Sequence, residues 1–160
     1  MLKEIGKHIT KWTITKFEDE AHFAQGDSYE TRVIEGNILL NEGITLMLNL
    51  LAGLGGTAYN NANAYLGVGE STTAAAASQT GLSGATKTYK PMEATYPQVS
   101  GQTITFRSVF GSTDANNVWQ EFTVVNASSD TGTNLNRKVD NQGTKVAGQV
   151  WTLDLDITFA

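Results

Sequence analysis

The chain of 160 residues contains no cysteine, and both of its histidines, His8 and His22, lie among the first 35 residues. The lack of cysteine excludes disulfide bonds and thiolate metal sites. Enzymes most often use histidine, cysteine or clustered carboxylates held in a rigid pocket. Because residues 36–160 contain neither histidine nor cysteine, we expect a structural or interaction protein and not an enzyme.

The chain also lacks an excess of basic charge and a long hydrophobic run. Its 11 Lys and Arg against 16 Asp and Glu give a formal net charge of −5, which disfavours nucleic-acid binding. The most apolar stretch, residues 38–54, is interrupted by polar residues and is too short to span a bilayer. Residues 1–15 lack the apolar segment of a secretion signal. We therefore expect no nucleic-acid or membrane partner, and synthesis in a cytoplasm.

Residues 1–32 are predicted to form an extended N-terminal arm. Their charges are mixed, their apolar residues are irregularly spaced, and residues 18–20 form an acidic run. Such a segment does not bury enough surface to fold alone. We expect it to become ordered on a neighbouring subunit, and the alternative is a strand folded back on its own domain. The side chains predicted to anchor the arm on its partner are Ile5, Ile9, Trp12, Ile14 and Phe17.

A β-rich body is predicted over residues 33–160, with one short helix at about 41–52. Asn41 is a plausible N-cap, and Gly53 is a natural stop. Apolar residues between them recur at helical spacing; they are Leu40, Ile44, Met47, Leu48 and Leu51. Because the helix is apolar almost all round, we expect it to be buried.

The rest of the body alternates between apolar and polar residues, as β-strands do. The clearest strand is 150–159, in which Trp151 and every second residue after it should face the core. Pro91 places the strand at 87–92 on a sheet edge. Several short strands separated by turns predict an antiparallel sandwich or barrel, and the pattern leaves both open.

No motif in the chain requires a cofactor or a metal ion. Asp154 and Asp156 lie on one strand face and could bind Ca²⁺ or act as an acid–base pair. We interpret them as part of a solvated face, balanced by a cation from Arg107, Arg137 or Lys138. A carbohydrate-active enzyme that uses these aspartates or Glu121 is a less favoured hypothesis.

Several segments of the body resemble small structural proteins of tailed bacteriophages. They are VIEGN at 33–37, NEGI at 41–44, AYNNANAYLGVGES at 58–71, TITFRS at 103–108, LNRKV at 135–139, GTK at 143–145 and WTL at 151–153. The resemblance implies a capsid decoration (cement) protein: a β-rich homotrimer on the virion exterior that binds the major capsid protein. It also implies an N-terminal arm that can hook neighbouring capsomers. It assigns no individual functional residue.

The sequence therefore predicts a protein that stabilises the capsid by binding, without catalysis. The alternative is a tail or fibre-associated component that binds the host surface. In that case the polar loops at 60–63 and 70–84 would contact a host glycan.

Overall fold

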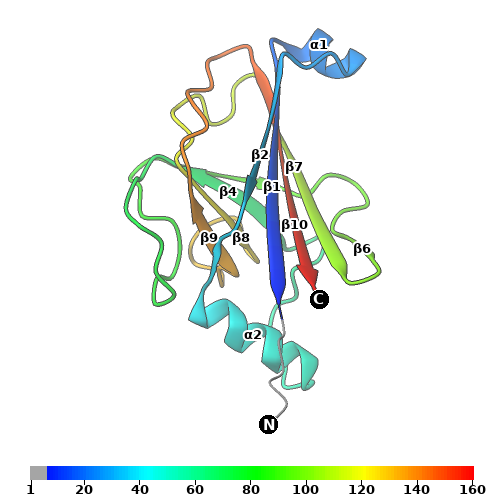
Figure 1. Ribbon diagram of the computed structural model, residues 1–160, viewed down its shortest axis with the longest axis vertical. Coiled ribbons are helices and arrows are strands. Elements are labelled where there is room, and N and C mark those ends of the chain that lie inside the picture. Colours follow the sequence, from blue (N-terminus) through cyan, green and yellow to red (C-terminus); the bar gives the residue numbers. More distant parts are fainter. Residues whose placement is uncertain (1–6) are drawn as a thin grey trace.

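Two antiparallel five-stranded sheets pack face to face in the computed structural model, which describes residues 7–160 (Figure 1). The first sheet has the order β2 (Glu30–Glu35), β1 (His8–Phe17), β10 (Val150–Phe159), β7 (Thr103–Phe110) and β6 (Gln98–Ser100). The second has the order β3 (Ile38–Leu39), β9 (Asn136–Val139), β8 (Glu121–Val125), β4 (Tyr65–Gly69) and β5 (Lys87–Pro91). The mainly β prediction is confirmed, and the fold is a sandwich.

Strand alternation places the expected residues in the core. Along β10, Trp151, Leu153, Leu155 and Ile157 are buried, while the residues between them are partly exposed. Phe106 and Phe110 of β7 also point inward. Pro91 lies on β5, an edge strand, as predicted.

Aromatic rings from both sheets meet in the centre of the core. The ring of Trp119 lies 4.8 Å from that of Phe110 and 4.9 Å from that of Trp151, with tilts of 68° and 65°. Phe122 of β8 joins this cluster from the second sheet, 5.7 Å from Trp12 of β1. Edge-to-face pairs of this kind stabilise by about 0.5–1.5 kcal/mol each beyond the burial of their area.

The described part of the predicted arm belongs to the body. Strand β1 lies inside the first sheet, paired with β10 along its whole length from His8 opposite Phe159 to Phe17 opposite Val150. It pairs with β2 on its other side. The arm predicted over 1–32 is therefore corrected for residues 8–32, and the boundary at residue 32 falls within β2. Residues 8–17 instead form a strand within their own domain, which was the alternative expected from the sequence.

A short helix that the sequence reading missed, α1 (Glu20–Gln25), connects β1 to β2. Asp19 caps it by accepting a hydrogen bond from the backbone N–H of His22 at 2.9 Å. Gly26 ends it with φ of 70°, a conformation that favours glycine. The acidic run at 18–20 is therefore the start of a capped helix.

Helix α2 (Asn41–Leu51) lies across one end of the sandwich, as Figure 1 shows. The helix was predicted correctly, but its burial was not: only Gly43 and Leu46 are buried. A Cβ on Gly43 would lie 2.5 Å from the Cα of Leu135, so the glycine lets α2 approach the sheet closely. The N-cap is Leu40, not Asn41. None of the helices in residues 7–160 is long and apolar enough to cross a membrane.

Candidate functional site

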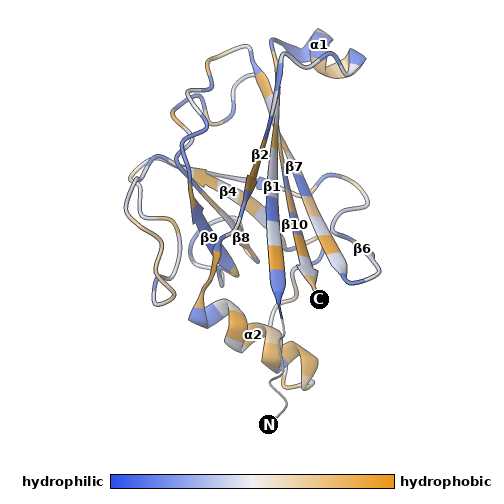
Figure 2. Ribbon diagram, in the orientation of Figure 1, coloured by the Kyte–Doolittle hydropathy of each residue, from blue (hydrophilic) through white to orange (hydrophobic). Residues whose placement is uncertain are grey.

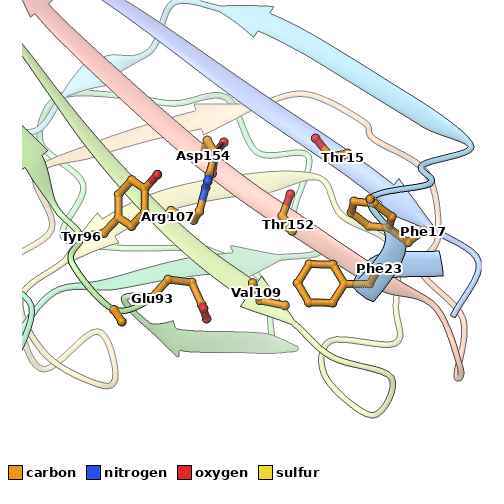
Figure 3. Close-up of a pocket in the computed structure, with 11 residues that line it drawn as sticks. Thr15, Phe17, Phe23, Glu93, Tyr96, Arg107, Val109, Thr152 and Asp154 are labelled. Carbon is orange, nitrogen blue, oxygen red and sulfur yellow. Dashed lines mark hydrogen bonds and ion pairs between the residues drawn. The ribbon is translucent and has the colours of Figure 1, made fainter. Parts of the chain in front are cut away.

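A groove of about 480 Å³ runs across the outer face of the first sheet (Figure 3). Its floor consists of outward side chains of three neighbouring strands, because Thr15 of β1 is opposite Thr152 of β10, which is opposite Val109 of β7. One wall comes from α1 and its C-cap, and the other from the loop between β5 and β6. The wall residues are Phe23 and Gly26 on one side and Glu93, Ala94 and Tyr96 on the other.

An ion pair lies in the groove floor. Arg107 donates from Nε to Asp154 Oδ1 at 2.7 Å and from Nη2 to Oδ2 at 2.6 Å. Its guanidinium also lies 5.0 Å from the centre of the Tyr96 ring. The hydrogen bonds to Asp154 raise the pKa of Arg107 further above its already high value. The two side chains are 41% and 15% exposed, so both can contact a ligand.

The interpretation of Asp154 and Asp156 as part of a solvated face, balanced by cations, agrees with these contacts. Asp154 is paired with Arg107, one of the cations named from the sequence. Asp156 is paired with Lys11 at 2.9 Å and also accepts a hydrogen bond from Thr105. Arg137 and Lys138 take other partners: Arg137 binds Glu121, and Lys138 donates to the backbone carbonyl of Glu35.

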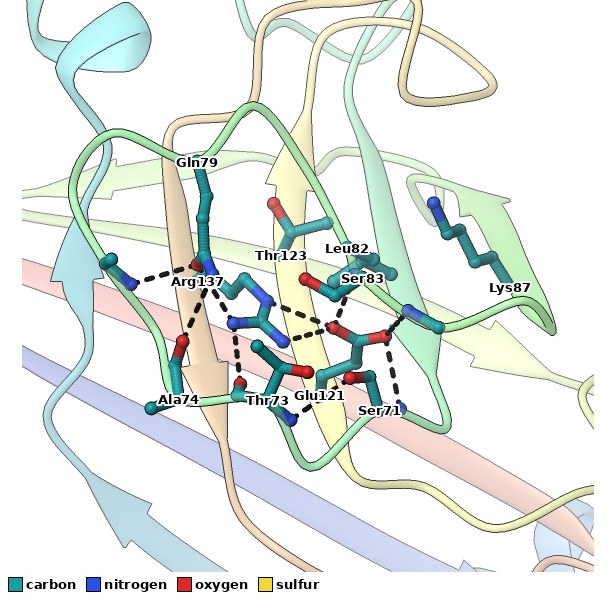
Figure 4. A network of polar contacts seen from close by, with 12 residues as sticks. Ser71, Thr73, Ala74, Gln79, Leu82, Ser83, Lys87, Glu121, Thr123 and Arg137 are labelled. Carbon is teal, nitrogen blue, oxygen red and sulfur yellow. Dashed lines mark hydrogen bonds and ion pairs between the residues drawn. The ribbon is translucent and has the colours of Figure 1, made fainter.

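A second, fully buried ion pair holds the loop between β4 and β5 against the second sheet (Figure 4). Arg137 donates from Nε and Nη2 to Glu121 Oε2, at 3.0 and 2.6 Å. Glu121 also accepts from the backbone N–H groups of Ser71, Ser83 and Gly84. Both side chains of the pair are 0% exposed. Glu121 is therefore enclosed and structural, which removes the basis for giving it a catalytic role.

The other arm of Arg137 extends this network. Its Nη1 donates to the carbonyl of Thr73 and to Gln79 Oε1, both at 2.9 Å. Gln79 in turn accepts from the backbone N–H of Ala76. The polar loop at 70–84, named from the sequence as a glycan contact, thus directs much of its hydrogen bonding toward the body.

The end of the sandwich covered by α2 is apolar. Four of its side chains are strongly exposed for large aliphatic residues: Ile44 at 36%, Leu48 at 58%, Leu51 at 83% and Leu54 at 77%. We call these four residues the apolar end. Figure 2 shows hydrophobic colouring along α2. A cavity of about 280 Å³ lies at the same end, lined by Leu39, Met47, Tyr59, Ile104, Phe106, Leu135, Ile157 and Phe159.

The five predicted anchor residues do not form one surface. Trp12 and Ile14 are fully buried in the core. Phe17 is buried under α1, where its ring meets that of Phe23 at 5.2 Å. Ile9 is 43% exposed, and Ile5 lies outside the described residues. Trp12, Ile14 and Phe17 are therefore not free to anchor a partner.

The two histidines lie apart in the structure. His8 contacts the ring of Phe159 at 6.5 Å between centroids, while His22 Nδ1 lies 2.7 Å from Asp19 Oδ1. The hydrogen bond to Asp19 raises the pKa of His22. Within residues 7–160, no group of three His, Cys, Asp or Glu side chains is placed to hold a metal ion.

The groove walls were not found from the sequence. Glu93 and Tyr96 lie in a loop without strand periodicity, and Phe23 lies in the helix that was missed. Asn61 holds the loop between β5 and β6 by donating from Nδ2 to the carbonyls of Glu93 and Tyr96, at 2.9 and 2.7 Å. Only the outward positions of the floor follow from strand alternation.

Comparison of the chain with protein-family models, with curated proteins and with solved structures finds no match.

Proposed function

We propose that this protein is a structural component of a tailed-phage virion that decorates the capsid exterior and stabilises the shell. The resemblance of the seven body segments supports the class of protein. The observation that carries a binding function is the apolar end, where four large aliphatic side chains are exposed together. Clustered apolar surface on a folded protein is typical of an interaction site.

The apolar end replaces the N-terminal arm as the proposed contact with the major capsid protein. Burial of one exposed leucine side chain contributes roughly 1.5–3 kcal/mol, so Leu48, Leu51 and Leu54 together could supply most of a weak contact. Because they lie on α2 and the turn that follows it, they are held by the body and do not need to be ordered on binding.

In this proposal the protein acts by mass action and not by catalysis. A protein that binds the expanded shell more tightly than the unexpanded shell stabilises the expanded form by its binding free energy. Assembly as a homotrimer would place three apolar ends on neighbouring capsid subunits and raise the overall affinity above that of one contact.

Sedimentation with purified shells of the encoding phage tests the proposal. The purified protein should pellet with expanded shells that lack it, and should bind unexpanded shells more weakly. Replacement of Leu48 and Leu51 by serine should raise the dissociation constant at least tenfold, since the loss of two buried leucines exceeds about 1.4 kcal/mol.

Val99→Ser is the matched control, because Val99 is 73% exposed on β6 and lies outside the apolar end. It should bind shells as the wild type does. Equal binding by the double serine variant and the wild type would contradict the assignment of the contact to the apolar end. Antibody labelling of virions on the tail instead of the head would favour the tail-component alternative.

A further inference from the structure

We propose that the groove on the outer face of the first sheet binds a neutral oligosaccharide. This inference does not rest on the proposed function, because the groove lies on a different surface from the apolar end. It follows from the shape of the groove, its mixture of hydrogen-bond donors and acceptors, its exposed aromatic rings and the rigidity of its walls.

The groove has the size and shape for a short, extended ligand. Its volume of about 480 Å³ lies within the range of roughly 300–1,000 Å³ typical of small-molecule sites. The floor is a stretch of sheet, and the walls of α1 and of the loop between β5 and β6 stand at its two sides (Figure 3). A chain of two or three sugar rings could lie along such a floor.

The polar groups of the groove fit hydroxyl groups better than they fit a charged ligand. Arg107 uses Nε and Nη2 for Asp154, so Nη1 remains as a donor. Asp154 and the exposed Glu93 supply acceptors, while Thr15 and Thr152 supply hydroxyls that both donate and accept. One cation against two carboxylates does not favour a phosphate or sulfate group, and the mixture suits a polyol.

Aromatic rings lie on both walls. Tyr96 and Phe23 are each partly exposed at the groove, and Arg107 lies over one face of the Tyr96 ring. Sugar rings present C–H groups on their faces, which pack on the electron-rich face of an aromatic ring and bury apolar area. Val109 adds apolar floor between the two walls. A ligand with only hydrogen-bonding groups would leave these surfaces unused.

The walls and floor are held in place without a ligand. Asn61 fixes the loop of Glu93 and Tyr96 with two hydrogen bonds. Phe23 is fixed by its edge-to-face contact with Phe17, at an angle of 79° between the rings. Arg107 is held by its two hydrogen bonds to Asp154 on the neighbouring strand and by the Tyr96 ring. A preformed site loses little conformational entropy when it binds.

Titration of ¹⁵N-labelled full-length protein with maltotriose, cellotriose and N,N′,N″-triacetylchitotriose tests the inference by NMR. At least one of the three should shift amide signals of residues 93–96, 107–109 and 152–154, with a dissociation constant of about 1 mM or tighter. The absence of any shift with all three at about 10 mM would overturn it. So would shifts confined to residues outside the groove.

Two variants and one control locate the site. Tyr96→Ala should weaken binding about tenfold, and Glu93→Gln a few-fold, since each removes one type of contact. Glu35→Gln should have no effect, because Glu35 lies on β2 outside the groove. Unchanged binding in both groove variants would overturn the assignment, and Glu93→Gln keeps the test valid if Tyr96→Ala unfolds.

A basic tripeptide, Lys-Lys-Lys, separates the sugar from a cationic peptide that could pair with the two carboxylates. The inference expects the sugar to bind at 150 mM salt and the peptide to show weak binding that salt abolishes. Tighter binding of the peptide in the groove would overturn the proposal. Neither result depends on whether the protein binds phage shells.

Discussion

The protein contains two arginine–carboxylate pairs that use the same two arginine nitrogens but have opposite surroundings. Arg137–Glu121 and Arg107–Asp154 each use Nε and Nη2 of the arginine, with a shortest distance of 2.6 Å in both. The first pair is 0% exposed, and the second is 41% and 15% exposed. The two pairs therefore differ in solvent exposure, and this difference decides whether a pair stabilises the fold or is available to a ligand.

The buried pair is a structural anchor, and the exposed pair is a feature of a surface. Glu121 accepts hydrogen bonds from three backbone N–H groups of the loop between β4 and β5. Arg137 donates to the backbone carbonyl of Thr73 in the same loop. Removal of either partner leaves an uncompensated charge in the interior, which is costly. In the groove, water can replace either partner of Arg107–Asp154, so the pair contributes little to stability and can exchange partners with a ligand.

The largest effect is expected from Glu121→Gln. The neutral side chain leaves Arg137 charged and buried, which should lower the free energy of unfolding by about 3–5 kcal/mol. Urea unfolding followed by tryptophan fluorescence measures it, because Trp12, Trp119 and Trp151 are all buried. A loss below about 1 kcal/mol would show that water reaches the pair in solution.

Replacement of both partners, Glu121→Leu with Arg137→Met, sharpens the comparison. For an isolated buried pair, apolar replacement is often neutral or stabilising. Here we expect the double variant to stay about 2–4 kcal/mol less stable than the wild type, because the N–H groups of Ser71, Ser83 and Gly84 lose their acceptor. Full recovery in the same urea experiment would mean that the loop does not depend on the network.

Asp154→Asn is the matched change at the exposed pair, and its effect should be much smaller. We expect a loss of about 1 kcal/mol or less at low salt, because Arg107 is solvated. The difference from the wild type should shrink further as ionic strength rises. A loss as large as that of Glu121→Gln would abolish the distinction between the two pairs.

The smallest effect is expected at the most exposed pair, His22 with Asp19. The hydrogen bond between the two side chains raises the pKa of His22. The pKa of Asp19 is lowered, first by the hydrogen bond that it accepts from the backbone N–H of His22 and then by the one to the His22 ring. Any stabilisation from His22 is therefore present below its unfolded-state pKa and is lost as pH rises through its folded-state pKa. Asp19→Asn keeps a helix cap but should bring the pKa of His22 down toward its ordinary value.

An NMR titration of the His22 ring in the wild type and in Asp19→Asn measures this change. The titration midpoint should move to lower pH in the variant. At the acid end, the contribution of Asp19 should fade as pH falls through its own folded-state pKa, below its usual 3.8. An unchanged midpoint for His22 would show that the pair does not form in solution.

Much of the β framework could be predicted because it depends on local alternation. The strand at 150–159 shows which of its residues face the core without knowledge of its neighbours, as does the strand at 103–110. The turn residues around them mark where the strands end. The helix at 41–51 was likewise predicted from spacing alone, since Gly53 and the apolar repeat are local signals.

The position of residues 8–17 could not be predicted in the same way. Its inward positions include Lys16, a charged residue of a type that is almost never fully buried unless it is paired. Lys16 is only 3% exposed because Glu30 accepts from its Nζ at 2.6 Å, the carbonyl of Gln142 accepts at 2.7 Å, and the Trp151 ring lies 4.4 Å away. These partners come from three distant parts of the chain, so the strand resembles a polar arm until the sheet is assembled.

The sequence by itself therefore determined the class of fold, the inward faces of the long strands and the place of α2, because each depends on the spacing of neighbouring residues. The tertiary structure alone decided that β1 lies inside a sheet, that one side of α2 is exposed, that Glu121 is enclosed and that a groove forms over β1, β10 and β7. Each of these results depends on groups far apart in the chain. A local sequence pattern does not predict which partner a charged side chain or an apolar face will contact.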